Sequence, residues 1–178
     1  DGYLIHLNAY DGKVYCVGTG PSAMTVDAPM AALSSGQSVV IRGTITDISA
    51  GTEQNEQEAR FPNGVPVVSD ESMTAWMEYV YMQKPSPANV KGVPISIDVI
   101  DSNGNYRNIG TATSDGSGTF SLMWSPDISG KYTVITSFAG SESYYGSYAQ
   151  SAFAVDEAPI ATSAPTPIPT TMSEQYFI

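Results

Sequence analysis

The chain has 178 residues, enough for one domain of roughly 100 to 150 residues with additional arms. Its formal charge is −11, with 7 Lys and Arg residues against 18 Asp and Glu residues. Because the basic residues are scattered singly, we expect no binding to nucleic acid. The net negative charge would also repel an anionic membrane surface. Charged residues make up only 14% of the chain, which favours an extracellular β-protein over a cytosolic enzyme. No apolar run approaches the roughly 20 residues of a membrane span.

The first 20 residues predict a β-hairpin arm. Residues 3–9 and 14–17 are rich in strand-forming residues and flank the turn signal Asp11-Gly12. An isolated hairpin is marginally stable in water. We therefore expect it to dock on a neighbour and to contribute to self-association through Tyr3, Ile5 and Leu7.

The same segment, residues 1–18, resembles a half-blade of the quinoprotein-like (PQQ-type) β-propeller repeat. The resemblance lies in an apolar strand, an Asp-Gly turn and a Lys-x-Tyr strand. It implies either the end of a longer propeller protein or a hairpin of that type used in another setting, because a propeller needs at least four blades.

Cys16 and His6 are the only residues of their types in the chain. A single cysteine allows no intramolecular disulfide, and its place in an apolar alternating run predicts a buried small hydrophobic residue. His6 has no second His or Cys motif with metal-ligand spacing, so we expect it to pack or to lie at the surface.

Residues 22–156 predict an immunoglobulin-like antiparallel β-sandwich. Apolar and polar residues alternate with the period of two that places one face of a strand in a core. Trp124 is the expected anchor between the two sheets. The predicted strands cover residues 23–28, 37–47, 92–100, 106–113, 119–124, 132–138 and 148–155.

Residues 48–91 predict an insertion in this sandwich. Residues 48–71 lack periodicity and are rich in acidic side chains, which is typical of a solvated loop or of an acidic contact loop. Residues 72–83 show the apolar stripe of one short amphipathic helix. That stripe fits either core packing or a partner-binding face. The aromatic candidates for a ligand or partner face, there and elsewhere, are Trp76, Tyr79, Tyr81, Tyr144 and Tyr145, with Tyr148 as a further stacking candidate.

Residues 101–105 contain the pattern Asp-x-Asn-x-Asn. Asp101, Asn103 and Asn105 are weak candidates for calcium ligands, since the glycine and the distant glutamate of a calcium loop are not in place. A hairpin turn at Asn103-Gly104 explains the same residues. No other cofactor is expected.

The stretch 92–155 resembles the bacterial and archaeal Ig-like repeats of cell-surface proteins. The residues that show this resemblance lie in the ranges 130–134, 138–141, 144–147 and 153–155. These repeats form parts of adhesins, surface layers and stalks and have no common active site. The resemblance therefore implies a fold and a cell-surface location, and it transfers no functional residue.

Residues 157–178 form a Pro- and Thr-rich segment, which predicts an extended, semi-rigid tail. Tyr176 and Phe177 near its end are further candidates for self-association. Such a stalk commonly precedes a membrane anchor in surface proteins of the resembling kind.

These observations predict an extracellular structural or adhesive surface protein, of archaeal or bacterial type, which binds copies of itself or other surface proteins. The alternative is a non-catalytic carbohydrate-binding module on a membrane-anchored propeller protein. No nucleophile motif, phosphate-binding loop or His/Cys metal cluster occurs in the sequence, so we expect no enzymatic activity.

Overall fold

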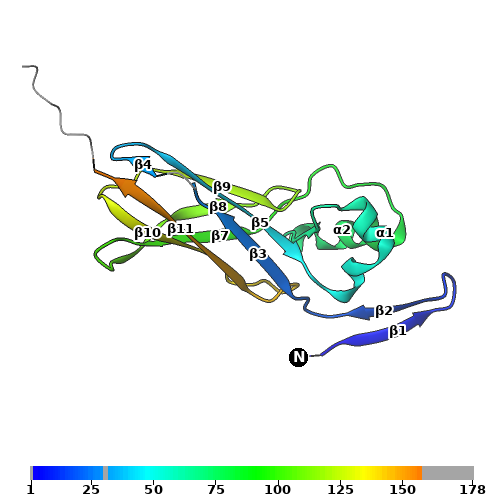
Figure 1. The fold of residues 1–178 in the computed structure, drawn as a ribbon. Helices are drawn as coiled ribbons and strands as arrows, with labels where there is room; N and C mark the ends of the chain where they lie inside the picture. Colours follow the sequence, from blue (N-terminus) through cyan, green and yellow to red (C-terminus); the bar gives the residue numbers. More distant parts are fainter. Residues whose placement is uncertain (1, 30–31, 158–178) are drawn as a thin grey trace, which may run out of the picture.

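The computed structural model describes residues 2–29 and 32–157 and shows an all-β sandwich of two sheets (Figure 1). The fold class predicted from the sequence is confirmed. One sheet has the strand order β4 (Leu33–Ser34), β11 (Ser147–Asp156), β10 (Gly130–Phe138), β7 (Pro94–Ile100) and β8 (Tyr106–Thr113). In the other, β5 (Val39–Asp47) pairs with β3 (Ser22–Asp27) along one edge and with β9 (Thr119–Trp124) and β6 (Val65–Pro66) along the other. All pairs are antiparallel except β4 with β11.

The core lies between the sheets and follows from the alternation along two strands. Val39, Ile41 and Ile45 point inward from β5, while the intervening Val40 and Arg42 are exposed. The same period of two buries alternate residues of β7 on the opposite sheet. Burial of each such side chain contributes about 1.5 to 3 kcal/mol, so the two strands anchor the sandwich.

A cluster of three aromatic rings, from Trp124, Tyr132 and Phe153, packs between the two sheets. Trp124 meets Tyr132 edge to face with ring centroids 5.2 Å apart, and Tyr132 stacks on Phe153 at 5.5 Å. Arg107 lies over the Trp124 ring at 5.6 Å and pairs with Asp127, which also accepts the Tyr132 hydroxyl at 2.9 Å. Trp124 is thus the anchor that the sequence predicts.

The insertion holds the helix that the sequence predicts and, in addition, a shorter α-helix and a 3-10 turn that it does not predict. The predicted helix is α2 (Asp70–Met82). The helix α1 (Asn55–Arg60) follows the 3-10 turn η1 (Ala50–Glu53) and has only six residues, too few to show a period in sequence. Arg60 donates hydrogen bonds to the carbonyl oxygens of Tyr79 (3.0 Å) and Val80 (2.9 Å), so α1 is held by the end of α2. In the described part of the chain, no helix has the length and apolar character needed to cross a membrane.

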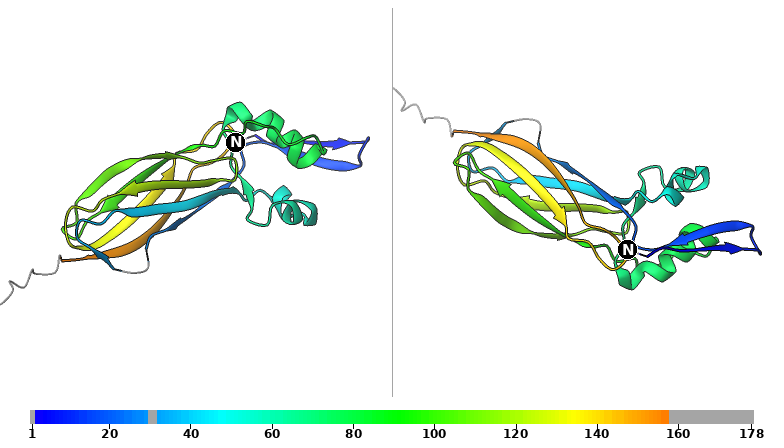
Figure 2. Two further views of the ribbon diagram at one scale, coloured as in Figure 1. Left: turned by 90° about the horizontal axis from the view of Figure 1, so that it is seen from above. Right: turned by 90° about the horizontal axis from the view of Figure 1, so that it is seen from below.

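The first strands, β1 (Leu4–Asn8) and β2 (Lys13–Val17), form the predicted hairpin as a separate two-stranded sheet. Figures 1 and 2 show that the hairpin projects beyond the sandwich on the same side as the helices. The end of β11 lies at the opposite end of the sandwich. Most of the predicted tail, including Tyr176 and Phe177, is outside the described residues.

Gly43 makes a close approach that the sequence alternation alone does not reveal. It is buried on β5, opposite Val26 of β3 and Phe120 of β9. A Cβ atom there would overlap the Thr25 carbonyl oxygen and lie 2.6 Å from Phe120 Cζ.

We predict that Gly43→Ala destabilises the fold by about 3 kcal/mol, because the central strand cannot move without disturbing both neighbours. Chemical denaturation measures this change. The control is Gly116→Ala, whose added Cβ would meet Val90 at an ordinary 3.5 Å. Equal stability of the two variants would contradict the proposed crowding.

Candidate functional site

The β1–β2 hairpin exposes large apolar side chains on both of its faces. Leu4 pairs with Val17 on one face, while Ile5 and Leu7 lie on the other face with Cys16 and Val14. Ile5, Leu7 and Val14 are each about two-thirds exposed. While these side chains are exposed to solvent, the hairpin lacks the hydrophobic stabilisation that it would gain if a neighbour buried them. The hairpin therefore has the surface of an element that a neighbour covers.

The exposure of Cys16 corrects the prediction that this residue is buried. Alternation correctly places Cys16 on the apolar face of its strand. Within the described residues no second layer buries this face, since its other members, Ile5, Leu7 and Val14, are also exposed. His6, also exposed, stacks on Tyr15 with ring centroids 5.4 Å apart.

The loop of residues 139–146 fixes the base of the hairpin. Gly20, between β2 and β3, donates its amide to the carbonyl oxygen of Ser143 at 2.9 Å. The Gly20 carbonyl oxygen in turn accepts the amide of Tyr145 at 2.9 Å. These two bonds form a short parallel bridge, which sets the point where the hairpin leaves the sandwich.

The same loop holds the N-terminus of α2 through Asp70. The Asp70 carboxylate accepts the Ser141 hydroxyl at 2.9 Å and the amides of Glu142 and Ser143 at 3.1 and 3.0 Å. The loss of some hydration on folding favours a raised pKa for the Asp70 carboxyl, but the hydrogen bonds from Ser143 and Ser141 outweigh it and lower the pKa. Asp70 also lies in the first turn of α2, where the helix dipole favours negative charge.

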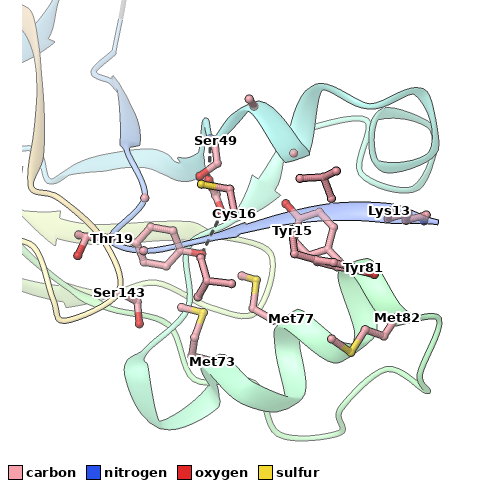
Figure 3. A pocket seen from close by; sticks show the side chains of 18 of the residues that line it. Lys13, Tyr15, Cys16, Thr19, Ser49, Met73, Met77, Tyr81, Met82 and Ser143 are labelled. Carbon is pink, nitrogen blue, oxygen red and sulfur yellow. Dashed lines mark hydrogen bonds between the residues drawn. The ribbon is translucent and has the colours of Figure 1, made fainter. Parts of the chain in front are cut away.

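A cavity of about 920 Å³ separates the hairpin from α2. In Figure 3, Met73, Met77 and Tyr81 rise from α2 toward the strand that contains Tyr15 and Cys16. The volume lies in the range of small-molecule sites. Its walls are the segment Lys13–Gly20, the end of β5 at Asp47, the start of the insertion (Ser49–Gly51, Gln54), α2, and the loop residues Glu142–Tyr144.

A buried carboxylate forms part of the cavity wall. Asp47 is only 6% exposed; it accepts the Ser49 amide at 2.8 Å and the Tyr144 hydroxyl at 3.2 Å. Burial and the negative charge of Asp47 raise the pKa of Tyr81 to about 12. The same two causes, in the same order, raise the pKa of Tyr144 well above its usual value. Both phenols are neutral near pH 7.

The aromatic residues predicted as a ligand face do not form one exposed platform. Trp76 and Tyr144 are 4% and 2% exposed, so both belong to the interior. Trp76 packs against Tyr79 with an angle of 51° between the rings. Tyr81 lines the cavity instead. The remaining two candidates, Tyr145 and Tyr148, are exposed.

The weak calcium candidates form a hydrogen-bonded turn. Oδ1 of Asp101 accepts the backbone amides of Asn103 and Asn105, both at 2.9 Å. Oδ2 accepts the Asn105 side chain at 3.0 Å. Both carboxylate oxygens are therefore used within the loop. Among the described residues, no group of three His, Cys, Asp or Glu side chains is placed to hold a metal ion.

Sequence reasoning missed Asp47 as a cavity residue. The signal was present, because strict alternation along β5 places Asp47 on the same inward face as Ile45. An acid at an inward position is a polar residue that needs an explanation. Gly20 determines where the hairpin is attached. Its sequence context indicates only that the hairpin ends there, and it does not indicate the contact with the loop of residues 139–146.

No protein-family model matches this sequence, and no curated protein matches it. Among solved structures, the chain is similar to a crystal structure of a tetra-tandem repeat in the extending region of a large adhesion protein. The TM-score is 0.43 and the identity 17%, over 78% of this chain and 24% of that one. A likeness this distant says nothing about what this chain does.

We predict that Asp70→Asn lowers stability at pH 7 by about 1 kcal/mol, because a charged acceptor of three hydrogen bonds becomes neutral and the site is partly open to solvent. A carboxyl whose pKa is lowered by folding stabilises the fold fully above its unfolded pKa of about 4. This contribution is lost as the pH falls through the folded pKa. The two proteins should therefore converge in stability in acid, as measured by urea denaturation across pH.

The matched control is Glu71→Gln, which removes the same charge from the adjacent residue. Glu71 pairs only with Lys91 at the surface, with both side chains more than 60% exposed, so its loss should change stability little. An equal effect of the two substitutions would show that the hydrogen bonds of Asp70 do not hold α2.

Proposed function

We propose that this chain is a non-catalytic structural or adhesive module of the cell surface, which self-associates through the β1–β2 hairpin. The observation that supports this proposal best is the exposure of apolar side chains on both faces of the hairpin, which projects from one end of the sandwich. Each hairpin strand also has one edge unpaired within the described residues. Such an edge can add strands from another chain.

The positions of the two ends support an extended arrangement of copies. The hairpin lies at one end of the sandwich, and β11 finishes at the other (Figure 1). Contacts made at opposite ends of a module generate lines of subunits rather than compact clusters. The composition, with 14% charged residues, and the resemblance to Ig-like surface repeats support a location outside the cell.

We predict that the full chain forms dimers or larger assemblies and that Leu7→Lys shifts it to monomer, because a charged side chain cannot be buried against an apolar neighbour without a partner. Light scattering after gel filtration, over a range of protein concentrations, measures the mass. Met123→Lys is the matched control, since Met123 is 71% exposed on β9 of the sandwich. A wild-type chain that stays monomeric at every concentration would contradict self-association.

A second candidate function is supported by the same observation, that the β1–β2 hairpin is apolar on both faces. A contact by strand addition forms hydrogen bonds along the edge of the hairpin and leaves its two faces exposed to solvent. A hairpin inside a larger β-domain is instead covered on both faces. In this arrangement the hairpin completes a sheet of an adjoining domain, such as the propeller that its sequence resembles. The sandwich would then be a module on a larger, membrane-anchored protein, and a monomeric wild-type chain is the result that this alternative expects.

A carbohydrate-binding role has less support within that second candidate. Stacking on a sugar needs exposed and roughly coplanar rings. Trp76 and Tyr144 are buried, so they cannot serve as such a surface.

A further inference from the structure

The Asp47 carboxylate lacks a cationic partner in the part of the chain that the structure describes. The ion pairs there join Lys91 to Glu71 and Arg107 to Asp127. Asp47 receives two neutral hydrogen bonds. A carboxylate that is 6% exposed loses most of its hydration, and such a group usually needs a counter-charge as well as hydrogen bonds.

The cavity beside Asp47 is open to a ligand that could supply this charge. The acidic residues of its lining are Asp47 and Glu142, whereas its one basic lining residue is Lys13, at the start of β2 near the hairpin turn. The whole chain has a formal charge of −11, which draws cations toward it. The electrostatics therefore favour a positively charged occupant.

The remaining walls favour an alkylated cation over a hydrated one. Met73 and Met77, one turn apart on α2, present thioethers to the cavity, and Tyr81 and Tyr15 present aromatic rings (Figure 3). Thioethers and ring faces are polarisable surfaces that do not replace the water shell of a small ion. Aromatic faces together with negative charge form the sites that recognise quaternary ammonium groups.

We propose that this cavity binds a methylated ammonium group, with Asp47 as the counter-charge and with Tyr81, Met73 and Met77 as its apolar contacts. The volume of about 920 Å³ leaves room for a body attached to that group. The inference goes beyond the structural role proposed above and does not depend on self-association.

The test is a titration of the full-length Leu7→Lys chain with choline, followed by the methyl NMR signals of Met73 and Met77 and by calorimetry. This variant separates ligand binding from assembly, because Leu7 is not a cavity residue. The comparison ligand is the neutral tert-butyl isostere of choline, which has the same shape without the charge. We expect choline to bind at millimolar concentrations or below, and the isostere to bind at least about tenfold more weakly.

Variants assign the binding to these residues. Asp47→Asn should weaken choline binding at least about tenfold, while Asp27→Asn, the same change on the exposed side of β3, should leave it unchanged. If Asp47→Asn fails to fold, Tyr81→Leu replaces it and should also weaken binding. Equal affinity for choline and its isostere, no choline binding at millimolar concentrations, or undiminished binding by a folded Asp47→Asn chain would each overturn the proposal.

Discussion

The arrangement of the hairpin, the helix and the cavity depends on the short loop between β10 and β11. Its backbone bridges Gly20, its serines and amides surround the Asp70 carboxylate, and its Tyr144 hydroxyl reaches Asp47. These contacts join segments about 70 to 125 residues apart in sequence. Closing such long loops costs conformational entropy. The hydrogen bonds of this loop offset part of that entropic cost. They hold the insertion and the hairpin against the same end of the sandwich.

The sandwich itself could be predicted from the sequence because its information is local. The alternation along β5 and β7 predicts which side chains face inward, and the Asp11-Gly12 pair indicates where the hairpin turns. The helix α2 was visible for the same reason, since thirteen residues are long enough to show a stripe. In each of these cases a periodic pattern and a favourable turn agree with the fold.

The site could not be predicted in the same way, because it depends on contacts between distant segments. Cys16 shows the limit clearly: its alternation indicates a buried face, yet the structure exposes it, since a pattern cannot say which body covers a face. Trp76 and Tyr144 show the converse, with aromatic residues that suggest a binding surface but fill the interior. The short helix α1 depends on the hydrogen bonds of Arg60 to α2, which no propensity encodes.

The direction of the strands has a mechanical consequence. The hairpin enters the sandwich through β3, and the chain leaves it through β11 at the far end (Figure 1). A pulling force applied at these two points runs nearly parallel to the strands. It therefore shears the whole ladders of β3 with β5 and of β11 with β10 at once, instead of opening them one hydrogen bond at a time. A module connected in this way resists extension along its long axis more strongly than one whose strands are opened singly.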